Sequence, residues 1–292
     1  MTLRKFSDKF MAKFNAVVGI SNIVIVFLIF IFIFSNGINF FKDYSAKDFL
    51  TGTEWISLSG KYGLLPLLVG SLWTTGIALA IAIPLSVISA IYIAEYAPKK
   101  MKNRLKSLIE TMSALPSVVL GFIGLYVLSG PVKEIFKLQT GLTALTGGIM
   151  LAFMAIPTIV SITDDALRAL DGSYKEASLA LGANKLETIV KILLPAAFPG
   201  IFAGIMLGFG RVIGETLTVL MITGNAPIMA GTPLSPVRTM TATIASEMGE
   251  VVQGSTHYFS LFAIGIVLFA ISFITNTLGD YFIHKSRKIM GR

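Results

Sequence analysis

An arginine and a glutamate interrupt an otherwise apolar segment of this sequence, which runs from Gly200 to Gly224. Arg211 lies near the middle of the segment, and Glu215 follows four residues later, on the same face if the segment is helical. A guanidinium stays ionised and binds phosphate-type oxygens through its planar fork. Two interpretations remain open. The residues form a self-neutralising structural pair, or Arg211 meets an anionic substrate while Glu215 holds or releases it.

The composition indicates that this segment crosses a membrane. Of the 292 residues, 54% are hydrophobic and only 14% are charged, whereas soluble domains have roughly 25% charged residues. A helix needs about 20 apolar residues to cross the hydrocarbon core. We therefore predict an all-α, polytopic membrane protein. Its six transmembrane helices are expected near Asn15–Phe34, Leu64–Ile93, Ser107–Ser129, Gly141–Ile162, Gly200–Gly224 and Tyr258–Ile283.

Lys and Arg are unevenly distributed between the alternate segments that link these spans. Seventeen lie on the side that holds Met1 and six on the opposite side, with Arg211 inside a span. Because cytoplasmic loops carry such an excess, we expect a multi-pass protein of the cell (inner) membrane with both termini in the cytoplasm. The same sorting accounts for the net charge of +8 in a chain embedded in the lipid bilayer, and no nucleic-acid partner is expected.

The spans suggest a simple division of the chain. We predict a first transmembrane helix with an external segment (1–63), a core of five transmembrane helices (64–283) and a cytoplasmic tail (284–292).

The sequence does not indicate cofactor chemistry. It contains no cysteine and only two histidines, His257 and His284, so we expect no metal site. It also lacks the ATP-binding pattern G-x-x-x-x-G-K-[ST], since the Gly60-Lys61 pair is followed by Tyr62. We therefore expect no enzyme activity and no bound cofactor, and any ATP and Mg²⁺ are used by a partner subunit.

The longest cytoplasmic loop, 164–199, is predicted to form two short helices. Ser173 and Glu176 have the spacing of a capping box at the start of the first helix. Gly182 is suited to the left-handed conformation that ends a helix. The first helix of the loop is therefore expected between these residues.

The second helix of the loop is predicted from another capping box, Asn184 with Glu187. Pro195 is expected to end this unit before the fifth span. On pattern alone the loop either packs on its own helix ends or offers a docking surface. The apolar stripe of the second helix consists of Leu186, Ile189, Val190 and Leu193.

The same loop resembles a motif of ATP-driven (ABC) importer permeases, the EAA motif. The resemblance is carried by Glu176, Ala177, Gly182, Ile192 and the Leu194-Pro195 pair, whose spacings all match; Ser178 stands where the motif has a second alanine. It implies a permease core of the MetI-like, type I class. It also implies that the loop is the coupling helix, which docks on a separate ATPase subunit.

Prolines and glycines occur at regular positions inside the spans. Pro116 and Pro157 lie in similar hexapeptides, beginning Ala114-Leu115 and Ala155-Ile156. A proline frees a carbonyl group, so each is either a packing kink or a hinge that lines a pathway. Glycines that recur every four residues in the fifth span predict close packing on another helix. They are Gly200, Gly204 and Gly208.

A narrower resemblance, over about Leu64–Ile283, is to phosphate-importer permeases of the PstC type. It is carried by the segment from Arg211 through Thr216 to Asn225 and by the segment 237–250. It implies inorganic phosphate as the substrate, a PstA-like permease as heterodimer partner, two PstB-like ATPase subunits and an external PstS-like binding protein. The candidate substrate or translocation residues are Arg211, Glu215, Thr216, Arg238, Thr239 and Thr241. The threonine series either supplies hydroxyl donors or caps a short helix.

Other functions remain open at this point. The anion could be molybdate, tungstate or sulfate, or the chain could be the PstA-type sister subunit. An ion-coupled secondary transporter with Glu215 as the proton site, or a phosphate-sensing signalling subunit, would also fit a polytopic chain.

Overall fold

The computed structural model describes residues 2–289, with side chains described for Met11 and for 13–282. The fold is helical, with one two-stranded antiparallel hairpin in which Trp55 pairs with Tyr62. The helices and strands before residue 140 are α1 (Thr2–Asp43), α2 (Ala46–Thr51), β1 (Trp55–Ile56), β2 (Lys61–Tyr62), α3 (Leu65–Ile91), α4 (Lys99–Ser113), α5 (Ser117–Ile123) and α6 (Ser129–Ile135). Those after it are α7 (Ala144–Arg168), α8 (Gly172–Ala180), α9 (Lys185–Thr188), α10 (Leu194–Ile213), α11 (Leu217–Ile222), α12 (Met240–Glu247) and α13 (Thr256–Ile289). A 3₁₀ turn covers Ser57–Ser59, and π-helical turns cover Tyr92–Tyr96, Gly124–Leu128 and Ile189–Leu193.

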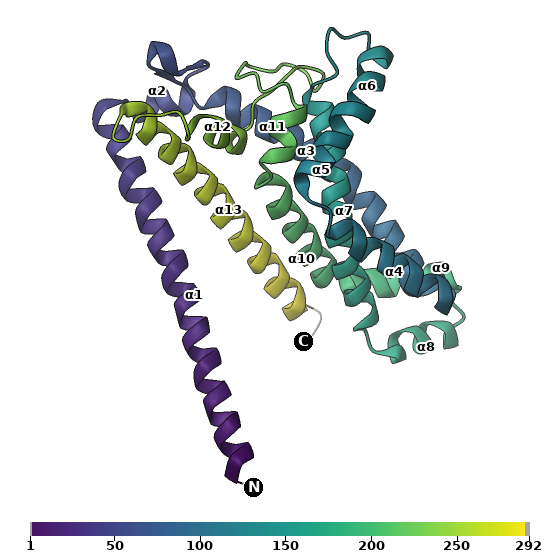
Figure 1. The fold of residues 1–292 in the computed structure, drawn as a ribbon. Coiled ribbons are helices and arrows are strands. Elements are labelled where there is room, and N and C mark those ends of the chain that lie inside the picture. Colours follow the sequence, from purple (N-terminus) through teal and green to yellow (C-terminus); the bar gives the residue numbers. More distant parts are fainter. Residues whose placement is uncertain (1, 290–292) are drawn as a thin grey trace.

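Six helical segments in the described part of the chain are long and apolar enough to cross a membrane, as predicted. Figure 1 shows them between two ends of the molecule. The hairpin, α2, α6, α11 and α12 gather at one end, which we call the α12 end. The loop helices α8 and α9 lie at the opposite end, the α8 end, towards which α1 and α13 also run.

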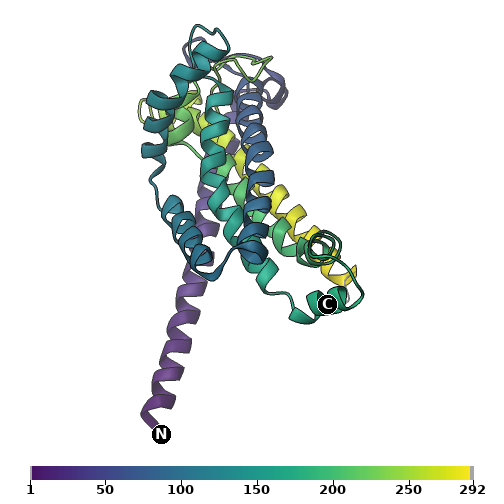
Figure 2. The same cartoon turned by 90° about the vertical axis from the view of Figure 1, so that its right-hand side faces the viewer.

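The third span begins later than predicted. Helix α4 ends at Ser113, and the chain runs through Pro116 before α5 begins at Ser117, so the crossing segment is Ser117–Ile135 rather than Ser107–Ser129. The physical reason is Pro116, which disfavours helical backbone in the residue before it and has no N–H to continue the helix. Helix α4 is separated from α5 by this break (Figure 2).

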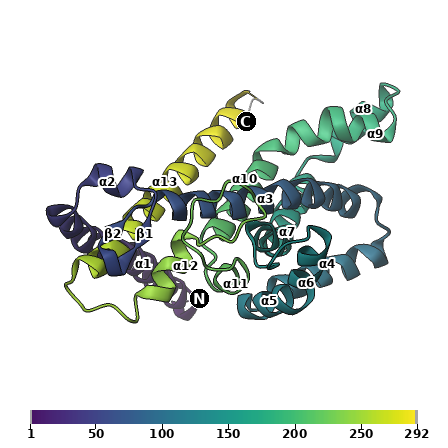
Figure 3. The same ribbon diagram turned by 90° about the horizontal axis from the view of Figure 1, so that it is seen from above.

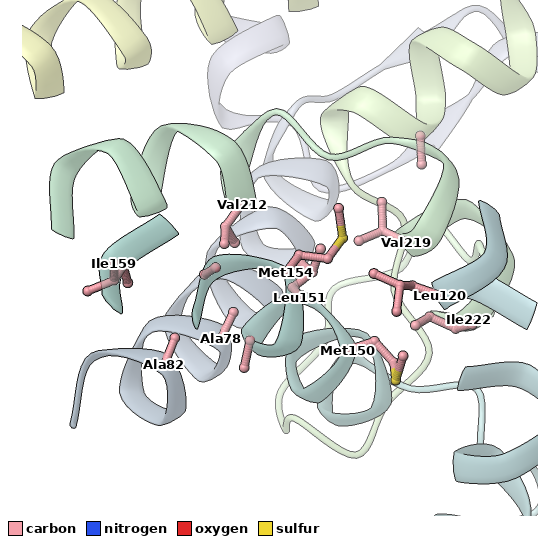
Figure 4. Close-up of a cluster of buried hydrophobic side chains, with 13 residues drawn as sticks. Ala78, Ala82, Leu120, Met150, Leu151, Met154, Ile159, Val212, Val219 and Ile222 are labelled. Carbon is pink, nitrogen blue, oxygen red and sulfur yellow. The ribbon is translucent and has the colours of Figure 1, made fainter. Parts of the chain in front are cut away.

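The centre of the bundle is formed by α3, α7 and α10. Figure 4 shows the buried cluster that joins them to α5 and α11. Leu151 and Met154 on α7 lie at its middle, with Ala78 and Ala82 on one side and Val212 on the other. Small side chains on α3 allow α7 to approach closely, which is how helices associate in lipid.

The predicted glycine face of the fifth span packs on α7. A methyl group added to Gly200 would lie 2.4 Å from Ala166 Cβ, and one added to Gly208 would lie 2.7 Å from Ile159 Cγ1. A methyl group added to Gly204 would lie 3.2 Å from Ile162 Cβ. The glycines therefore place α10 in the bundle centre, and this prediction is confirmed.

A first testable prediction concerns this face. Gly208→Ala should destabilise the protein by about 1–3 kcal/mol, since overpacking in a close-packed core costs about that much. The measurement is the thermal midpoint of the purified protein in detergent. Gly210→Ala is the matched control, because nothing lies within 4 Å of the added methyl group. Equal midpoints for the two variants would contradict the close contact between α10 and α7.

The α12 end is closed by a separate aromatic cluster. Phe40, Phe49, Trp55 and Tyr62 are buried there against Leu261 of α13. The cluster joins the first helix, α2 and the hairpin to α12 and α13, as seen from above in Figure 3. Through Met240 it fixes the start of α12, next to the predicted site residues Arg238, Thr239 and Thr241.

Candidate functional site

Arg211 lies in the last turn of α10 and contacts the span α7 and the end of α4. One terminal nitrogen, Nη1, donates to Thr158 Oγ1 of α7 at 3.1 Å. The other, Nη2, donates to the backbone oxygen of Ser113 at 3.4 Å, where α4 ends. Both acceptors are neutral, so these bonds orient the guanidinium without cancelling its charge. They use only part of its set of donors.

Arg211 and Glu215 do not form the self-neutralising pair that was one of the two interpretations left open by the sequence. Helix α10 ends at Ile213, so the two residues do not share a helix face. Glu215 instead accepts a hydrogen bond from Thr218 N at 3.1 Å and satisfies a free N–H at the start of α11. Gly214 lies between the two helices. A glycine at this point weakens the helix, and the carboxylate stabilises the new helix start.

The break at Pro116, just before the third span, is held by residues of α10 and α11. Arg211 binds the Ser113 oxygen on one side of Pro116, and Thr218 Oγ1 donates to the Ser117 oxygen at 3.0 Å on the other. A carbonyl group left free in a membrane must find such a partner. The two proline segments therefore meet at Arg211, since Thr158 directly follows Pro157. Pro157 itself remains inside the continuous helix α7.

Thr158, Ser113 and Thr218 were not identified from the sequence. Each contributes a single neutral oxygen, and none has a side chain that stands out in an apolar span. The repeated Ala-x-Pro hexapeptides were the signal that could have found the first two, since one contains Thr158 and the other begins directly after Ser113.

The threonines before and within α12 lie beside Glu215. Thr239 Oγ1 accepts from Ala242 N at 3.2 Å and caps α12, which confirms the capping interpretation. Thr241 Oγ1 donates to the backbone oxygen of Glu215 at 2.7 Å. Thr216 Oγ1 donates to the Gly214 oxygen at 3.3 Å. The start of α12 is therefore tied to the chain between α10 and α11.

Arg238 does not join Arg211, because Glu247 at the end of α12 holds it. Their ion pair is 2.6 Å long, and both side chains are largely buried. Glu247 also accepts from Trp55 Nε1 at 3.2 Å and lies 2.7 Å from His257 Nε2. Arg238 Nε donates to the Asn225 oxygen at 3.1 Å. Arg238 is therefore part of a polar cluster at the end of α12, which we call the clasp. Its members are Arg238, Glu247, Trp55 and His257.

Tyr62 lies beside this clasp, with its ring 5.8 Å from that of His257. Burial, followed by the charge of Glu247, raises the pKa of the Tyr62 phenol above its usual value. The phenol therefore stays neutral near pH 7, and Arg238 remains the ionic partner of Glu247.

The loop after α7 forms the two predicted helices, with one correction at its start. Helix α8 begins at Gly172 and is capped by Asp171, whose carboxylate accepts from Ser173 N at 2.9 Å. The proposed box of Ser173 with Glu176 is therefore wrong. An ionised carboxylate is a stronger cap than a hydroxyl and lies nearer the free N–H groups.

The second half of the loop agrees better with the prediction. Asn184 and Glu187 form the expected reciprocal capping box of α9, and Gly182 has a φ of +85°. Pro195 does not end the unit, since it occupies the first turn of α10 and the helix runs on from α9 through a π-helical turn. A proline can be accommodated there because the π-helical turn before it already departs from the regular α-helical hydrogen-bond pattern.

The residues that match the EAA motif, together with their neighbours in α8 and α9, differ in exposure. Glu176, Ala177, Gly182 and Pro195 are exposed. Ile192 is 36% exposed, while Leu181 at the end of α8 is 90% exposed. Of the predicted stripe, Ile189 and Leu193 are buried on the bundle, whereas Leu186 and Val190 are exposed. Ser178 is buried and bonds Thr188 at 2.9 Å, which locks α8 to α9.

Six spans around a polar break, with a rigid two-helix loop at one end, define the permease subunit of an ABC importer. The chain belongs to the family of binding-protein-dependent transport system inner membrane components, whose sequence model matches residues 82–288. It is therefore a multi-pass inner-membrane transport subunit.

Within this family, the chain is similar to several permeases with named functions. The chain is 40% identical to a probable ABC transporter permease protein, YqgH, of Bacillus subtilis, over 79% of this chain and 75% of the relative. It is 31% identical to the phosphate transport system permease protein PstC of Mesorhizobium japonicum (80% and 77% covered). It is 30% identical to a probable PstC of Methanocaldococcus jannaschii, over 93% of each chain.

Solved structures agree on the fold. A bacterial ABC transporter involved in the import of alginate superposes with a TM-score of 0.60 at 16% identity, over 91% of this chain and 92% of that one. The MetNI methionine ABC transporter gives a TM-score of 0.57 at 18% identity, over 77% and 94%. The MetI-like fold prediction is thereby confirmed.

Proposed function

We propose that this chain is the membrane permease of an ATP-driven importer for inorganic phosphate, and that phosphate passes Arg211. The observation that carries the proposal is the guanidinium of Arg211, whose hydrogen bonds within the described part of the chain go to the neutral oxygens of Thr158 and Ser113. A charge placed in a span costs about 2.5–3.5 kcal/mol on insertion scales, so it usually marks a substrate route. An uncompensated cation of this shape favours a tetrahedral oxyanion.

The choice of phosphate rests on the relatives. Several proteins about 30% identical to this chain over most of its length are named phosphate transport permeases. Glu215 contributes in a different way from the one expected. Its side chain fixes the start of α11, and its backbone oxygen accepts a hydrogen bond from the Thr241 hydroxyl. Glu215 therefore positions the chain on the outer side of the Arg211 site.

Energy and partners follow from the family. We propose that two PstB-like subunits hydrolyse ATP with Mg²⁺ and dock on the loop helices α8 and α9. A PstA-like permease completes the membrane pathway, and a PstS-like protein delivers phosphate at the α12 end. The excess of Lys and Arg supports an orientation with the α8 end, both termini included, in the cytoplasm.

Uptake of labelled phosphate into proteoliposomes that contain the complete complex tests this proposal. We expect uptake that requires ATP inside the vesicles with the ATPases, and that excess unlabelled phosphate suppresses by at least about tenfold. Sulfate, molybdate and tungstate at the same concentration are the matched competitors, and stronger suppression by one of them would assign the permease to that oxyanion. Uptake that persists without ATP but collapses with the proton gradient would contradict an ATP-driven importer.

A further inference from the structure

The α8-end terminus of helix α3 is held by the loop helices. Helix α3 continues through the π-helical turn Tyr92–Tyr96, and Glu95 in that turn is a largely buried carboxylate. Lys175 of α8 forms an ion pair with it, with Nζ 2.5 Å from Oε2. Lys185 of α9 donates to the Glu95 backbone oxygen at 2.8 Å and lies 4.1 Å above the Tyr96 ring.

These contacts satisfy a definite physical need. The last carbonyl groups of a helix have no partner within it, and cations are favoured near them. Lys102 at the start of α4 supplies a third cation, to the Ala94 oxygen at 3.0 Å. Because two of the three lysines come from the loop, any displacement of α8 and α9 acts directly on the end of α3.

The other terminus of α3 is held by the chain around α12. Ser71 is buried, and its Oγ accepts from the backbone N–H of Met240 at 3.0 Å. A methyl group added to Gly70 would lie 2.5 Å from the Arg238 oxygen, so the two backbones are in close contact. Trp73 Nε1 donates to the Ala230 oxygen at 3.1 Å.

Between these ends, α3 is one continuous helix that includes Pro84. It packs closely on α7, whose Gly148 meets Ile77 and whose Gly147 faces Thr74. At a rise of about 1.5 Å per residue, the segment from Ser71 to Glu95 spans roughly 36 Å. A packed helix of this kind moves as a unit more readily than it deforms.

We infer that α3 is the mechanical connection between the ATPase-docking loop and the outer side of the Arg211 site. A displacement of α8 and α9 acts on Glu95 through Lys175 and Lys185. Helix α3 transmits it to Ser71, which is hydrogen-bonded to Met240 of α12. Thr241 of α12 is in turn hydrogen-bonded to Glu215. Glu95 and Ser71 are thus positioning residues that act on the site without touching it. The inference rests on the proposed importer function.

A distance measurement tests the connection without any anion. The chain contains no cysteine, so spin labels at Ala245→Cys on α12 and Ile135→Cys on α6 report only the α12 end. In the complete complex, ATP binding should shift the distance between the labels. Glu95→Gln and Ser71→Ala should each abolish the shift, with the complex still assembled. An unchanged shift in both variants would overturn the inference.

Two matched controls separate the connection from a general loss of polar contacts. Glu54→Gln removes a carboxylate from an exposed ion pair with Lys61 at the α12 end. Ser260→Ala removes a buried hydroxyl that donates only within α13, to the His257 oxygen. Both should keep the shift. The exchanged pair Glu95→Lys with Lys175→Glu should restore it, and a failure of this rescue would reduce Glu95 to a structural role.

Transport coupling supplies the second measurement. In proteoliposomes, Glu95→Gln and Ser71→Ala should each raise the ATP hydrolysed per phosphate imported by at least about fivefold. The double variant should equal either single one, because the two contacts lie in series on one path. Multiplied effects in the double variant would show two independent defects and overturn the inference. If the wild-type complex imports no phosphate, the proposed function fails, while the distance measurement still tests α3.

Discussion

Arg211→Gln should lower phosphate uptake by about a hundredfold while the complex still assembles. Glutamine keeps a polar side chain with a hydrogen-bond donor, but it is shorter than arginine and carries no charge. Hydrogen bonds to charged groups are worth about 1.5–3 kcal/mol, and each 1.4 kcal/mol is a factor of ten. The loss of one bidentate contact to an oxyanion therefore suffices for this effect. The measurement is initial uptake in proteoliposomes, normalised to the complex present.

Two further variants sharpen this result. Arg211→Lys keeps the charge but loses the planar fork, so we expect uptake between those of the wild type and Arg211→Gln. Arg104→Gln is the matched control, because Arg104 is an exposed arginine on α4, away from the break at Pro116. Uptake of Arg211→Gln equal to that of Arg104→Gln would exclude a required role for Arg211.

The sequence predicted the spans well because hydrocarbon imposes a strong and simple condition on them. It failed where a span is interrupted, at Pro116 in the third and Gly214 in the fifth. Apolar residues lie on both sides of each position, so hydropathy averaged over a span does not register the break. What decides it is a partner for the freed backbone groups, and here Arg211, Thr218 and Glu215 provide them from elsewhere in the chain.

The same reason explains why Arg211 and Glu215 do not pair, although their spacing allowed a pair as one of two interpretations. Sequence spacing places two residues on one face only if the helix continues between them. Both residues were identified as site candidates, and the structure does place both beside the break. Their partners were not predictable, because a hydroxyl such as Thr158 or a backbone oxygen such as that of Ser113 has no distinguishing sequence pattern.

Deleting Glu176–Leu181 should abolish copurification of the chain with its ATPase. The deletion removes most of α8, which is exposed at the α8 end and offers Leu179 and Leu181 to a partner. It also removes Ser178, whose bond to Thr188 holds α8 on α9. The loss of binding in the deletion variant therefore combines the lost surface with a loosened loop.

Leu181→Glu separates these two effects, because a side chain that is 90% exposed contributes no packing within this chain. Burying a leucine in a partner is worth about 1.5–3 kcal/mol, so its replacement by a charge should weaken ATPase binding by at least about tenfold. The measurement is titration of the purified ATPase against the permease in detergent. Leu58→Glu, fully exposed at the α12 end, is the matched control and should bind as the wild type does. If Leu181→Glu binds equally well and only the deletion fails, the loop is needed for folding, and the ATPase docks elsewhere on this end of the molecule.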